Sequence, residues 1–335
     1  MNKGGRLLKA LITGITGFAG SHLAEYLLAR GNIEIYGTYR ARSRMDHISH
    51  LVDQITLVEC ELKDPHAVDQ MIKLSRPEQI YHLAAQSFVP TSWNSPADTL
   101  MNNIVSQLHL FEAVRKWDVD CKIQVACSSE EYGMVYPGEI PVQENNPLRP
   151  LSPYAVSKIA QDFLGYQYFQ SYGLPIVRTR TFNHTGPRRG EHFVTSNFAK
   201  QIAQIELGLQ PPFVDVGNLQ ARRDFTDVRD VVKAYWLALT HGEPGSVYNI
   251  SSGTTRTIEE VLQTLLTFTT ANVQIRVDSK RLRPSDVDVL LGDSSLFQEK
   301  TGWKPEIPFH QTMEDLLQYW RSILRCTKQK EGDNE

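Results

Sequence analysis

Leu7-Leu-Lys-Ala-Leu-Ile-Thr13 runs straight into Gly14-Ile-Thr-Gly17-Phe-Ala-Gly20, and this stretch decides the fold. Its first half is an apolar run typical of a buried parallel strand. Its second half has the spacing Gly-x-x-Gly-x-x-Gly before a helix predicted over Ser21 to Arg30. The first glycine permits a tight turn, the second admits a pyrophosphate close to the backbone, and the third lets the helix pack on the strand. The pyrophosphate would bind the free amides at the helix N-terminus.

This pattern predicts a dinucleotide site formed by Gly14, Thr16, Gly17, Phe18, Ala19 and Gly20. The loop after the second predicted strand, Ile33 to Thr38, indicates which dinucleotide binds. NAD-preferring sites usually carry an acidic residue there for the ribose hydroxyls, whereas this chain has Tyr39-Arg40-Ala-Arg42-Ser-Arg44. We therefore expect Arg40 and Arg42 to bind the 2′-phosphate of NADP. The alternative interpretation is a solvated basic loop.

Strands and helices alternate through the first half of the chain. Further strands are predicted at Thr56–Cys60, Gln79–Ala85, Lys122–Ala126 and Pro175–Phe182, and helices at about Asp98–Trp117 and up to Tyr172. This alternation is typical of a doubly wound parallel sheet. The carboxyl ends of such strands face the ligand. We therefore expect Asp64 to meet the adenine amino group, and the small residues of Leu83-Ala-Ala85 to let the backbone approach the cofactor.

The regular alternation ends after Asn183. We expect an α/β protein with a Rossmann-type, NADP-binding domain over residues 1–182, onto which later segments near 224–250 pack back. Residues 183–330 are predicted to form mainly a smaller, mixed α/β substrate lobe. Arginines of this lobe can hold a diphosphate through bidentate guanidinium groups: Arg188, Arg189, Arg222, Arg223 and Arg283. Surface ion pairing is the alternative interpretation for at least two of them.

Composition argues against several classes of function. The 335 residues carry a net charge of −3, and no basic tract points to nucleic acid or an anionic membrane. No apolar run approaches the ~20 residues needed to span a bilayer, and the first residues lead into a strand rather than a signal peptide. The four cysteines lack zinc-site spacing, which favours free thiols in a reducing cytoplasm and no metal.

Two segments carry the predicted chemistry, Ser128-Ser-Glu-Glu-Tyr-Gly133 and Tyr154-Ala-Val-Ser-Lys158. Tyr-x-x-x-Lys places a phenol and an ammonium one turn apart on one helix face, and Ser152-Pro153 predicts the start of that helix. The ammonium of Lys158 should lower the pKa of Tyr154, so that the phenol can accept a hydroxyl proton at neutral pH. A serine hydroxyl can hold the same substrate oxygen. The alternative is a surface pair that contributes little to stability.

Taken together, these residues resemble a known family. Gly14-x-x-Gly17-x-x-Gly20, Leu83-Ala-Ala85, Ser128, Tyr154-x-x-x-Lys158, Asn183 and Arg222-Arg-Asp-Phe225 look like an extended short-chain dehydrogenase/reductase acting on nucleotide sugars. The likeness covers Lys9 to about Trp320. Within that family the chain is most similar to GDP-mannose 4,6-dehydratases and GDP-4-keto-6-deoxymannose reductases. The segments that carry this finer likeness are Ala84-Ala-Gln-Ser-Phe-Val89, Ser92-Trp93, Phe193-Val-Thr195, Val216-Gly-Asn-Leu219 and Arg283-Pro-Ser-Asp-Val287.

The resemblance implies a role for each matching residue. Tyr154 is the active-site base, and Lys158 tunes it while gripping the nicotinamide ribose. Ser128 binds the C4 oxygen of the sugar, and Glu130 is the dehydratase glutamate. Ser129 stands where dTDP-glucose dehydratases carry aspartate and GDP-mannose dehydratases carry serine, which favours GDP-mannose as substrate. The implied substrate contacts are Ser87, Ser129, Asn183, Val194, Arg223 and Arg283.

The expected activity is conversion of GDP-mannose to GDP-4-keto-6-deoxymannose by oxidation at C4, loss of water across C5 and C6, and hydride return to C6. A carboxylate is needed for the C5 proton, and Glu130 supplies one. The alternative is an NADPH-dependent 4-ketoreductase giving GDP-rhamnose, because the Ser128–Gly133 and Arg223–Asp230 segments resemble the reductases more closely. An epimerase is disfavoured by Glu130, and a non-catalytic dinucleotide-binding regulator by the intact serine, tyrosine and lysine.

Apolar residues on two predicted helices, near Asp98–Trp117 and Ile159–Tyr172, exceed what one core-facing stripe requires. They are Leu108, Leu110, Phe111, Phe163, Leu164 and Tyr168. In the proteins that this chain resembles, the equivalent helices pair into a four-helix dimer interface. We therefore expect a homodimer or a homotetramer formed as a dimer of dimers. The alternative is that this surface packs under the second lobe.

Overall fold

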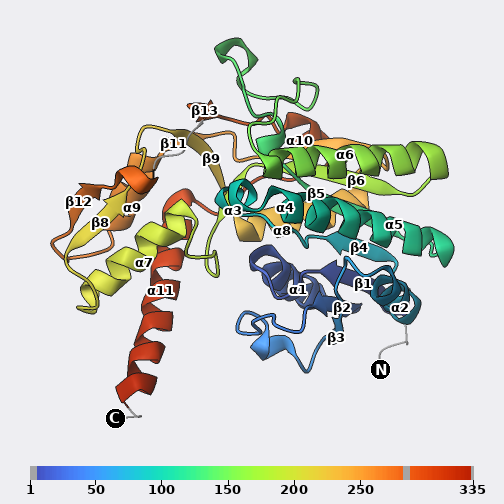
Figure 1. The fold of residues 1–335 in the computed structure, drawn as a ribbon, viewed down its shortest axis with the longest axis horizontal. Coiled ribbons are helices and arrows are strands. Elements are labelled where there is room, and N and C mark those ends of the chain that lie inside the picture. Colours follow the sequence, from blue (N-terminus) through green and yellow to red (C-terminus); the bar gives the residue numbers. More distant parts are fainter. Residues whose placement is uncertain (1–5, 282–286, 333–335) are drawn as a thin grey trace.

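A seven-stranded parallel sheet lies at the centre of the larger part of the molecule (Figure 1). The structure is a computed structural model that describes residues 6–281 and 287–332. The strand order is β10-β6-β5-β4-β1-β2-β3, and every pair is parallel. The strands are β1 (Leu8–Thr13), β2 (Ile33–Tyr39), β3 (Thr56–Glu59), β4 (Gln79–His82), β5 (Lys122–Ser128), β6 (Ile176–Thr181) and β10 (Val247–Ile250). The predicted doubly wound α/β fold is confirmed.

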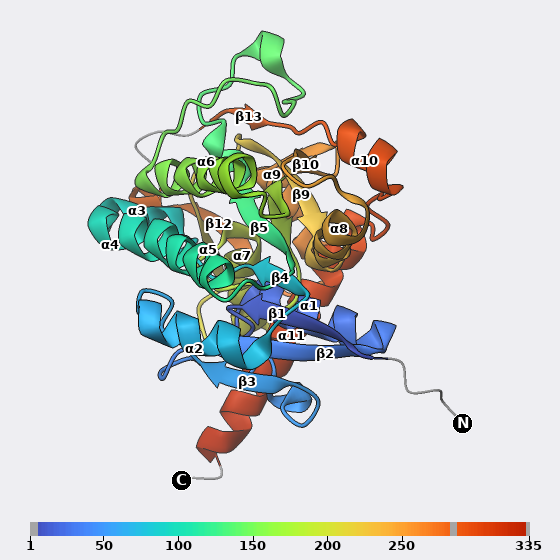
Figure 2. The ribbon, with the colours of Figure 1, turned by 90° about the vertical axis from the view of Figure 1, so that its right-hand side faces the viewer.

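Helices cover both faces of this sheet. One face carries α2 (Pro65–Ser75), α5 (Ser106–Lys116) and α6 (Pro153–Tyr172), and the other carries α1 (Phe18–Arg30) and α8 (Val228–His241). In Figure 2, α5 and α6 lie on one side of β5 and α8 lies on the other. Each layer has its own buried apolar cluster, so the sheet is buried on both faces as parallel sheets require.

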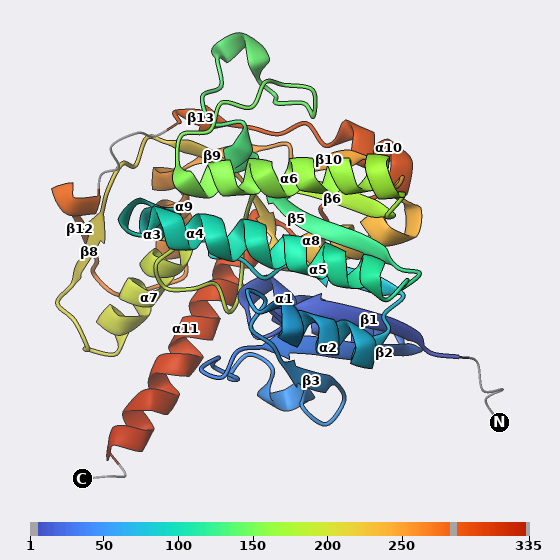
Figure 3. The same cartoon turned by 45° about the vertical axis from the view of Figure 1, so that its right-hand side comes forward.

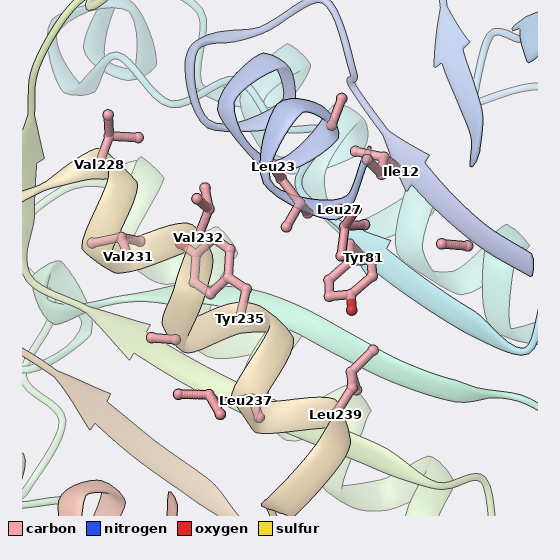
Figure 4. Close-up of a cluster of buried hydrophobic side chains, with 14 of the residues drawn as sticks. Ile12, Leu23, Leu27, Tyr81, Val228, Val231, Val232, Tyr235, Leu237 and Leu239 are labelled. Atoms are coloured by element: carbon pink, nitrogen blue, oxygen red, sulfur yellow. The ribbon is translucent and has the colours of Figure 1, made fainter. Parts of the chain in front are cut away.

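The buried cluster between α1 and α8 joins two helices that are far apart in the sequence. Leu23 and Leu27 of α1 lie in one buried group with Val232 and Tyr235 of α8 and with Tyr81 of β4 (Figure 4). All five are at most 2% exposed. Burying an aliphatic or aromatic side chain of this size stabilises by about 1.5–3 kcal/mol. The glycine turn at the start of α1 is therefore anchored by a helix that lies about two hundred positions later in the chain.

The second lobe has a separate core. Its helices are α7 (Val194–Glu206), α9 (Ile258–Leu266) and α11 (Phe309–Gly332), and its strands are β7 (Asn183–Thr185), β8 (Phe213–Val216), β9 (Arg222–Asp227), β11 (Thr255–Thr257), β12 (Gln274–Val277) and β13 (Val289–Leu290). Strand β9 pairs with β7, β11 and β13, whereas β8 pairs with β12. Phe198, Val214, Leu262 and Leu316 lie in its buried cluster. The lobe is seen beside the large sheet in Figure 1, and α11 leads away from it to the C-terminus (Figure 3).

Element boundaries differ from the sequence expectation in places with a physical reason. Helix α1 begins at Phe18 rather than Ser21, because Gly17 is already its N-cap. The long helix expected from about Asp98 is three consecutive helical pieces, α4 (Pro96–Leu100), a π-helical turn (Met101–Val105) and α5. Before them lies a short helix, α3 (Val89–Asn94).

Two expectations about the class of protein can be compared with the structure. Within the described part of the chain, the search for a helix long and apolar enough to cross a bilayer finds no candidate. Cys60, Cys121 and Cys127 are buried free thiols, as expected, whereas Cys326 is an exposed free thiol on α11. Burial raises the pKa of Cys60 and Cys121 to about 12, so these thiols are protonated.

Candidate active site

A cavity of about 930 Å³ opens at the carboxyl ends of the parallel strands and faces the lobe. Residues at or directly after β1, β2, β4, β5 and β6 form one wall, and residues of α7 and β9 form the other. This is where open α/β sheets bind their ligands, because loops that leave the strand ends diverge there. Its volume is in the upper part of the range usual for ligand sites.

The glycine turn lines one end of this cavity. Gly14 has φ +71°, and a Cβ there would lie 3.1 Å from the Cα of Ala84. A Cβ on Gly20 would lie 2.3 Å from the carbonyl oxygen of Gly14, so only glycine permits this approach of helix to strand. No described side chain caps α1 at Gly17, which leaves its first amides for an anion. The turn therefore fits a dinucleotide pyrophosphate, and Thr16, Phe18 and Ala19 line the cavity with it.

The end of β4 turns along the cavity earlier than expected. The strand was predicted to reach Ala85 but ends at His82. The hydroxyl of Thr13 accepts hydrogen bonds from the amides of Leu83 and Ala84, at 3.1 and 3.2 Å, and so takes them out of the sheet ladder. Leu83, Ala84 and Ala85 all line the cavity, where their small size leaves the backbone accessible.

Strand β5 and helix α6 bring the four predicted catalytic residues to this cavity. Ser128 is the last residue of β5, and Glu130 lies in the 3-10 turn that follows it, η3 (Ser129–Glu131). Tyr154 and Lys158 lie one turn apart on α6, which begins where expected because the Ser152 hydroxyl accepts the amide of Ala155 at 3.1 Å. All four line the cavity.

The ammonium of Lys158 is directed back toward the sheet. Its Nζ donates to the carbonyl oxygen of Ala126 at 2.9 Å and lies 5.9 Å from the centre of the Tyr154 ring. Only 4% of Lys158 and 7% of Tyr154 is exposed, so both polar tips are reached from the cavity alone. The hydroxyl of Ser128 accepts the amide of Glu130 at 3.2 Å and also hydrogen bonds to Tyr154.

The expected net lowering of the Tyr154 pKa is wrong for the arrangement of the protein's own residues. Burial raises the pKa of Tyr154 above its usual value, because desolvation penalises the phenolate. The hydrogen bond from Ser128 opposes that rise, and the charges of Glu130 and Glu131 add to it. Burial also lowers the pKa of Lys158. Glu130 lines the same cavity as Tyr154, so both side chains can face one ligand.

The arginine loop after β2 is only partly at the cavity. Arg40 lines it, together with Ser43, whose hydroxyl accepts the Arg40 amide at 2.9 Å. Arg42 is exposed and lies outside the cavity wall, and Arg44 pairs with Asp46 at 2.8 Å.

Asp64, expected at the adenine, instead caps α2 by accepting the His66 amide at 2.9 Å. The carboxylate that lines the cavity on this side is Glu61. A short N-terminal cap signal, Asp64-Pro65, could have shown this from the sequence, because aspartate before proline commonly starts a helix.

Most of the predicted substrate residues reach the cavity, and they come from both of its walls. Ser87, Ser129, Asn183, Val194 and Arg223 all line the cavity. Arg283 lies outside the described residues. Of the other lobe arginines, Arg188 forms an ion pair with Glu25 of α1, and the Arg222 guanidinium donates to Thr255 at 3.3 Å.

Arg189, expected to bind a diphosphate from the lobe, lies at the junction of the two walls, a position that sequence reasoning did not predict. Arg189 stacks against Phe193, with its guanidinium carbon 3.4 Å from the ring centre, and lies 4.9 Å from the ring centre of Phe18. Burial lowers the pKa of Arg189 to about 10, so it remains a cation. The ring of His184 stacks on the same Phe18, with 5.7 Å between ring centres, and burial lowers the pKa of His184 to about 3.

These residues place a cation and a neutral imidazole beside the glycine turn. His184 is the middle residue of a three-residue strand, β7, and Arg189 lies in the irregular loop after it. The arginines of the run Pro187-Arg-Arg-Gly190 were expected to hold a diphosphate from the lobe. The sequence did not indicate that Arg189 lies at the cofactor end of the cavity. Further lining residues that were not predicted are His192, Asn197, Asn218 and Arg281.

Comparisons with known proteins agree with this architecture. The chain is 37% identical over 324 residues to GDP-mannose 4,6 dehydratase 2 of Arabidopsis thaliana, covering 92% of this chain and 85% of that protein. It is 32% identical over 317 residues to GDP-6-deoxy-D-mannose reductase of Pseudomonas aeruginosa, covering 95% and 98%. A solved structure, RMD from Pseudomonas aeruginosa complexed with NADPH, superposes with a TM-score of 0.83 at 31% identity, covering 94% of this chain and 99% of that one.

The family comparison covers almost the whole chain. The model of the family described as GDP-mannose 4,6 dehydratase matches residues 11–316, which include the glycine turn, both catalytic segments and most of the lobe. The chain therefore belongs to the GDP-mannose 4,6 dehydratase family of extended short-chain dehydrogenase/reductases.

Proposed function

We propose that this protein is an NADP-dependent GDP-mannose 4,6-dehydratase, a lyase of nucleotide-sugar metabolism that produces GDP-4-keto-6-deoxymannose. The family supports a GDP-sugar substrate, but its named members include a reductase as well as dehydratases. The observation that carries the choice is Glu130, which lines the cavity beside Ser128 and Tyr154. Reduction of a 4-keto group needs no carboxylate there, whereas elimination of water needs a base for the C5 proton.

Ser128, Tyr154 and Lys158 begin the reaction. Ser128 holds the C4 hydroxyl of the mannosyl unit, and Tyr154 takes its proton. Bound NADP supplies the hydride acceptor for C4, the hydride donor for C6 and a positive ring charge that favours the phenolate. Lys158 holds the ribose hydroxyls and adds a second positive charge on this side. Because burial alone disfavours the phenolate, both charges matter for the pKa of Tyr154.

Glu130 performs the step that distinguishes the dehydratase. Once C4 is a ketone, the neighbouring C5 hydrogen is acidic, and the Glu130 carboxylate removes it. The C6 hydroxyl then departs as water, protonated by the acid that Glu130 has become. Ser129 offers a hydroxyl rather than a second carboxylate next to this position. When C6 receives its hydride, C5 must regain a proton, and Glu130 is placed to deliver it; the proton that Tyr154 took from the C4 hydroxyl balances this step, and the product keeps the 4-keto group.

The preference for NADP follows from the charges around the cofactor end of the cavity. Arg40 lies where the adenosine ribose of a bound dinucleotide is expected, and the loop carries no acidic residue to hold a free 2′-hydroxyl. Arg189 is positioned beside the glycine turn, where a pyrophosphate is expected. The relative solved with NADPH supports the same preference.

Incubation with GDP-mannose and no added reductant tests the proposal. We expect a product lighter than GDP-mannose by one water, seen by mass spectrometry, with no net consumption of cofactor. The proposal is wrong if GDP-mannose is returned unchanged by protein that binds NADP(H). The protein is a reductase if it oxidises NADPH in the presence of GDP-4-keto-6-deoxymannose. That alternative is favoured by the likeness of the Ser128–Gly133 segment to the reductases.

We also propose that the protein assembles as a homodimer or a dimer of dimers through α6 and the helical pieces beside it. Leu110, Phe111 and Tyr168 of the expected surface are instead buried in the sheet layer. The outer face of this layer nevertheless exposes Met101, Val156, Phe163 and Tyr166, between 45% and 54% each. α6 lies alongside α4 and α5 (Figure 3). Light scattering at micromolar concentration should show a dimer or larger, and Phe163→Glu should weaken it, whereas a wild-type monomer would contradict the proposal.

A further inference from the structure

A buried acid pair lies directly behind the catalytic turn. Its members are Glu131 of η3 and Asp162 of α6, both with fully buried side chains. Asp162 lies one turn after Lys158 on the same helix. A carboxylate oxygen of each lies within 4.8 Å of the other and of the sulfur of Cys127. The pair therefore connects the turn that carries Ser128 and Glu130 to the helix that carries Tyr154 and Lys158.

Two arginines of β6 donate hydrogen bonds to Asp162 rather than to Glu131. Arg178 donates to one oxygen of Asp162, and the Nε of Arg180 donates to its other oxygen at 2.7 Å. The same Nε lies 3.3 Å from Oε2 of Glu131, but without the geometry of a hydrogen bond. Among the described residues, Oε2 of Glu131 has no hydrogen-bond partner as an acceptor. The guanidinium groups also oppose a metal ion at this cluster, because they already satisfy the carboxylate of Asp162.

The other oxygen of Glu131 fixes the catalytic turn. Oε1 accepts the backbone amide of Ser128 at 2.8 Å, and the hydroxyl of Ser128 accepts the amide of Glu130 at 3.2 Å. This reciprocal arrangement is a capping box, which satisfies two amides at the start of a helical turn. One buried carboxyl group thus determines where the serine hydroxyl and the carboxylate of Glu130 lie.

An ionised Glu131 would be costly here, because its buried Oε2 loses its hydration and gains only the attraction of Arg180, without a hydrogen bond, next to the negative charge of Asp162. A protonated Glu131 removes that cost, since its hydroxyl can donate to the neighbouring Asp162. We propose that Glu131 is a positioning residue that works as a neutral acid, accepting from the Ser128 amide and donating to Asp162, so that one proton ties the catalytic turn to α6.

The charges around Glu131 agree with this assignment. Burial and the charge of Asp162 raise the pKa of Glu131 well above its usual value, and Arg180 opposes that rise. The titratable and charged groups that interact with it come from β5, α6, β6 and the residue after the turn: Cys127, Tyr132, Tyr154, Lys158, Asp162 and Arg180. Arg178 and Glu144 are one contact further away, on Asp162 and Arg180. A negative charge on Glu131 would raise the pKa of Tyr154, so a neutral acid also favours the phenolate.

Glu131→Gln tests the protonation state. Glutamine is neutral, keeps the acceptor for Ser128 and offers an N–H to Asp162. We expect kcat within roughly threefold of wild type and an unmoved ascending limb in the pH profile of kcat/KM. If Glu131 is ionised in the working enzyme, the substitution removes a negative charge beside Tyr154, and the ascending limb moves to lower pH. That movement would overturn the proposal.

Glu131→Leu tests the positioning role, because leucine neither accepts from Ser128 nor donates to Asp162. A displaced serine should lower kcat by roughly 10- to 100-fold, while KM and the affinity for NADP(H), measured by fluorescence titration, stay unchanged. Wild-type turnover in this variant would contradict the positioning role. Glu139→Leu is the matched control, since Glu139 closes a capping box of the same kind in the protruding loop near η4 (Pro137–Glu139; Figure 1). We expect it to leave kcat unchanged.

The activity assays of the Glu131 variants rest on the proposed function. A spectroscopic measurement does not, so it tests this inference separately. The infrared difference spectrum between wild type and Glu131→Gln should contain the carbonyl band of a protonated carboxyl group. A carboxylate band in its place would overturn the proposal. This measurement needs no sugar substrate and no turnover, and Glu131→Gln preserves the hydrogen bonds on which folding depends. If GDP-mannose proves not to be the substrate, the infrared result is unaffected.

Discussion

The two ends of the cavity are built in different ways. At the catalytic end, Ser128, Tyr154 and Lys158 stand on β5 and α6, each is less than a tenth exposed, and the segments are joined by buried hydrogen bonds. At the phosphate end, the cations Arg40 and Arg189 stand on loops, and one of them is exposed. A proton transfer needs its partners placed to a fraction of an ångström, whereas attraction between a guanidinium and a phosphate tolerates adjustment.

This difference predicts how substitutions divide between turnover and binding. Changes at the catalytic end should lower kcat and leave cofactor affinity intact. Changes at the phosphate end should lower affinity or selectivity and leave the chemistry intact once the cofactor is saturating. The experiments that follow test this division, from the largest expected effect to the smallest.

Tyr154→Phe should have the largest effect, because the C4 hydroxyl proton must leave before the hydride can. We expect kcat to fall by roughly a thousandfold or more, with NADP(H) binding close to wild type in a fluorescence titration. Turnover within tenfold of wild type would mean that another group is the base. Loss of cofactor binding together with kcat would break the division between the two ends.

Glu130→Gln should stop the elimination and spare the first oxidation. An amide cannot accept the C5 proton, so dehydration of GDP-mannose should fall by at least ~100-fold. Oxidation at C4 still has its residues, so reduced cofactor should accumulate and be visible by absorbance. Glu139→Gln, at an exposed turn, serves as the control. If Glu130→Gln dehydrates GDP-mannose like wild type, the assignment of this residue is wrong.

Arg189→Met should weaken NADP(H) binding by roughly 10- to 100-fold, because a charge-assisted contact to a phosphate contributes about 1.5–3 kcal/mol. Methionine keeps the apolar contact with Phe18 and Phe193. The adjacent Arg188 is a matched control, since its guanidinium is held by Glu25. Arg188→Met should change the affinity less. Equal losses in both variants would show that the loop as a whole, rather than one cation, supports binding.

Arg40→Ala should narrow the preference for NADP over NAD. We expect wild type to bind NADP(H) at least ~10-fold more tightly than NAD(H), equivalent to about 1.4 kcal/mol. Removing the Arg40 guanidinium should reduce that ratio and leave the affinity for NAD(H) nearly unchanged. Arg42→Ala should have the smaller effect, since Arg42 lies outside the cavity wall. Equal affinities of wild type for the two cofactors would contradict the NADP preference.

Much of the fold, and most residues at the catalytic end of the cavity, could be predicted from local patterns in the sequence. The glycine turn, the strands and Tyr154-x-x-x-Lys158 are local patterns whose spacing dictates geometry, and the structure brings them together at one cavity. Arg223 and Asn183, taken from a likeness to known proteins, also reach it. Asn183 lies just after β6, so it reaches the edge where the strands of the large sheet end, whereas Arg223 lies within β9 of the lobe and was placed by the likeness alone.

The unpredicted features depend on contacts between distant segments. Arg189 is placed by Phe18 and Phe193, which belong to opposite walls, and no local pattern encodes that meeting. Asp64 was assigned from its position after a strand, but its nearest amide donor is on the helix that it begins. Glu131 has the same chemistry as Glu130 next to it, and only the packing of α6 and β6 shows that one is buried and the other faces substrate.

The order of the strands in the large sheet has a consequence for the synthesis of the protein on the ribosome. Strand β10 closes one edge and α8 covers α1, yet both follow residue 227. A nascent chain that ends at residue 182 would expose the edge of β6 and the apolar side of α1, which are surfaces that promote aggregation. The nucleotide-binding half therefore cannot finish folding before β10, which ends at Ile250, has been translated, so nearly half of the lobe must be made first.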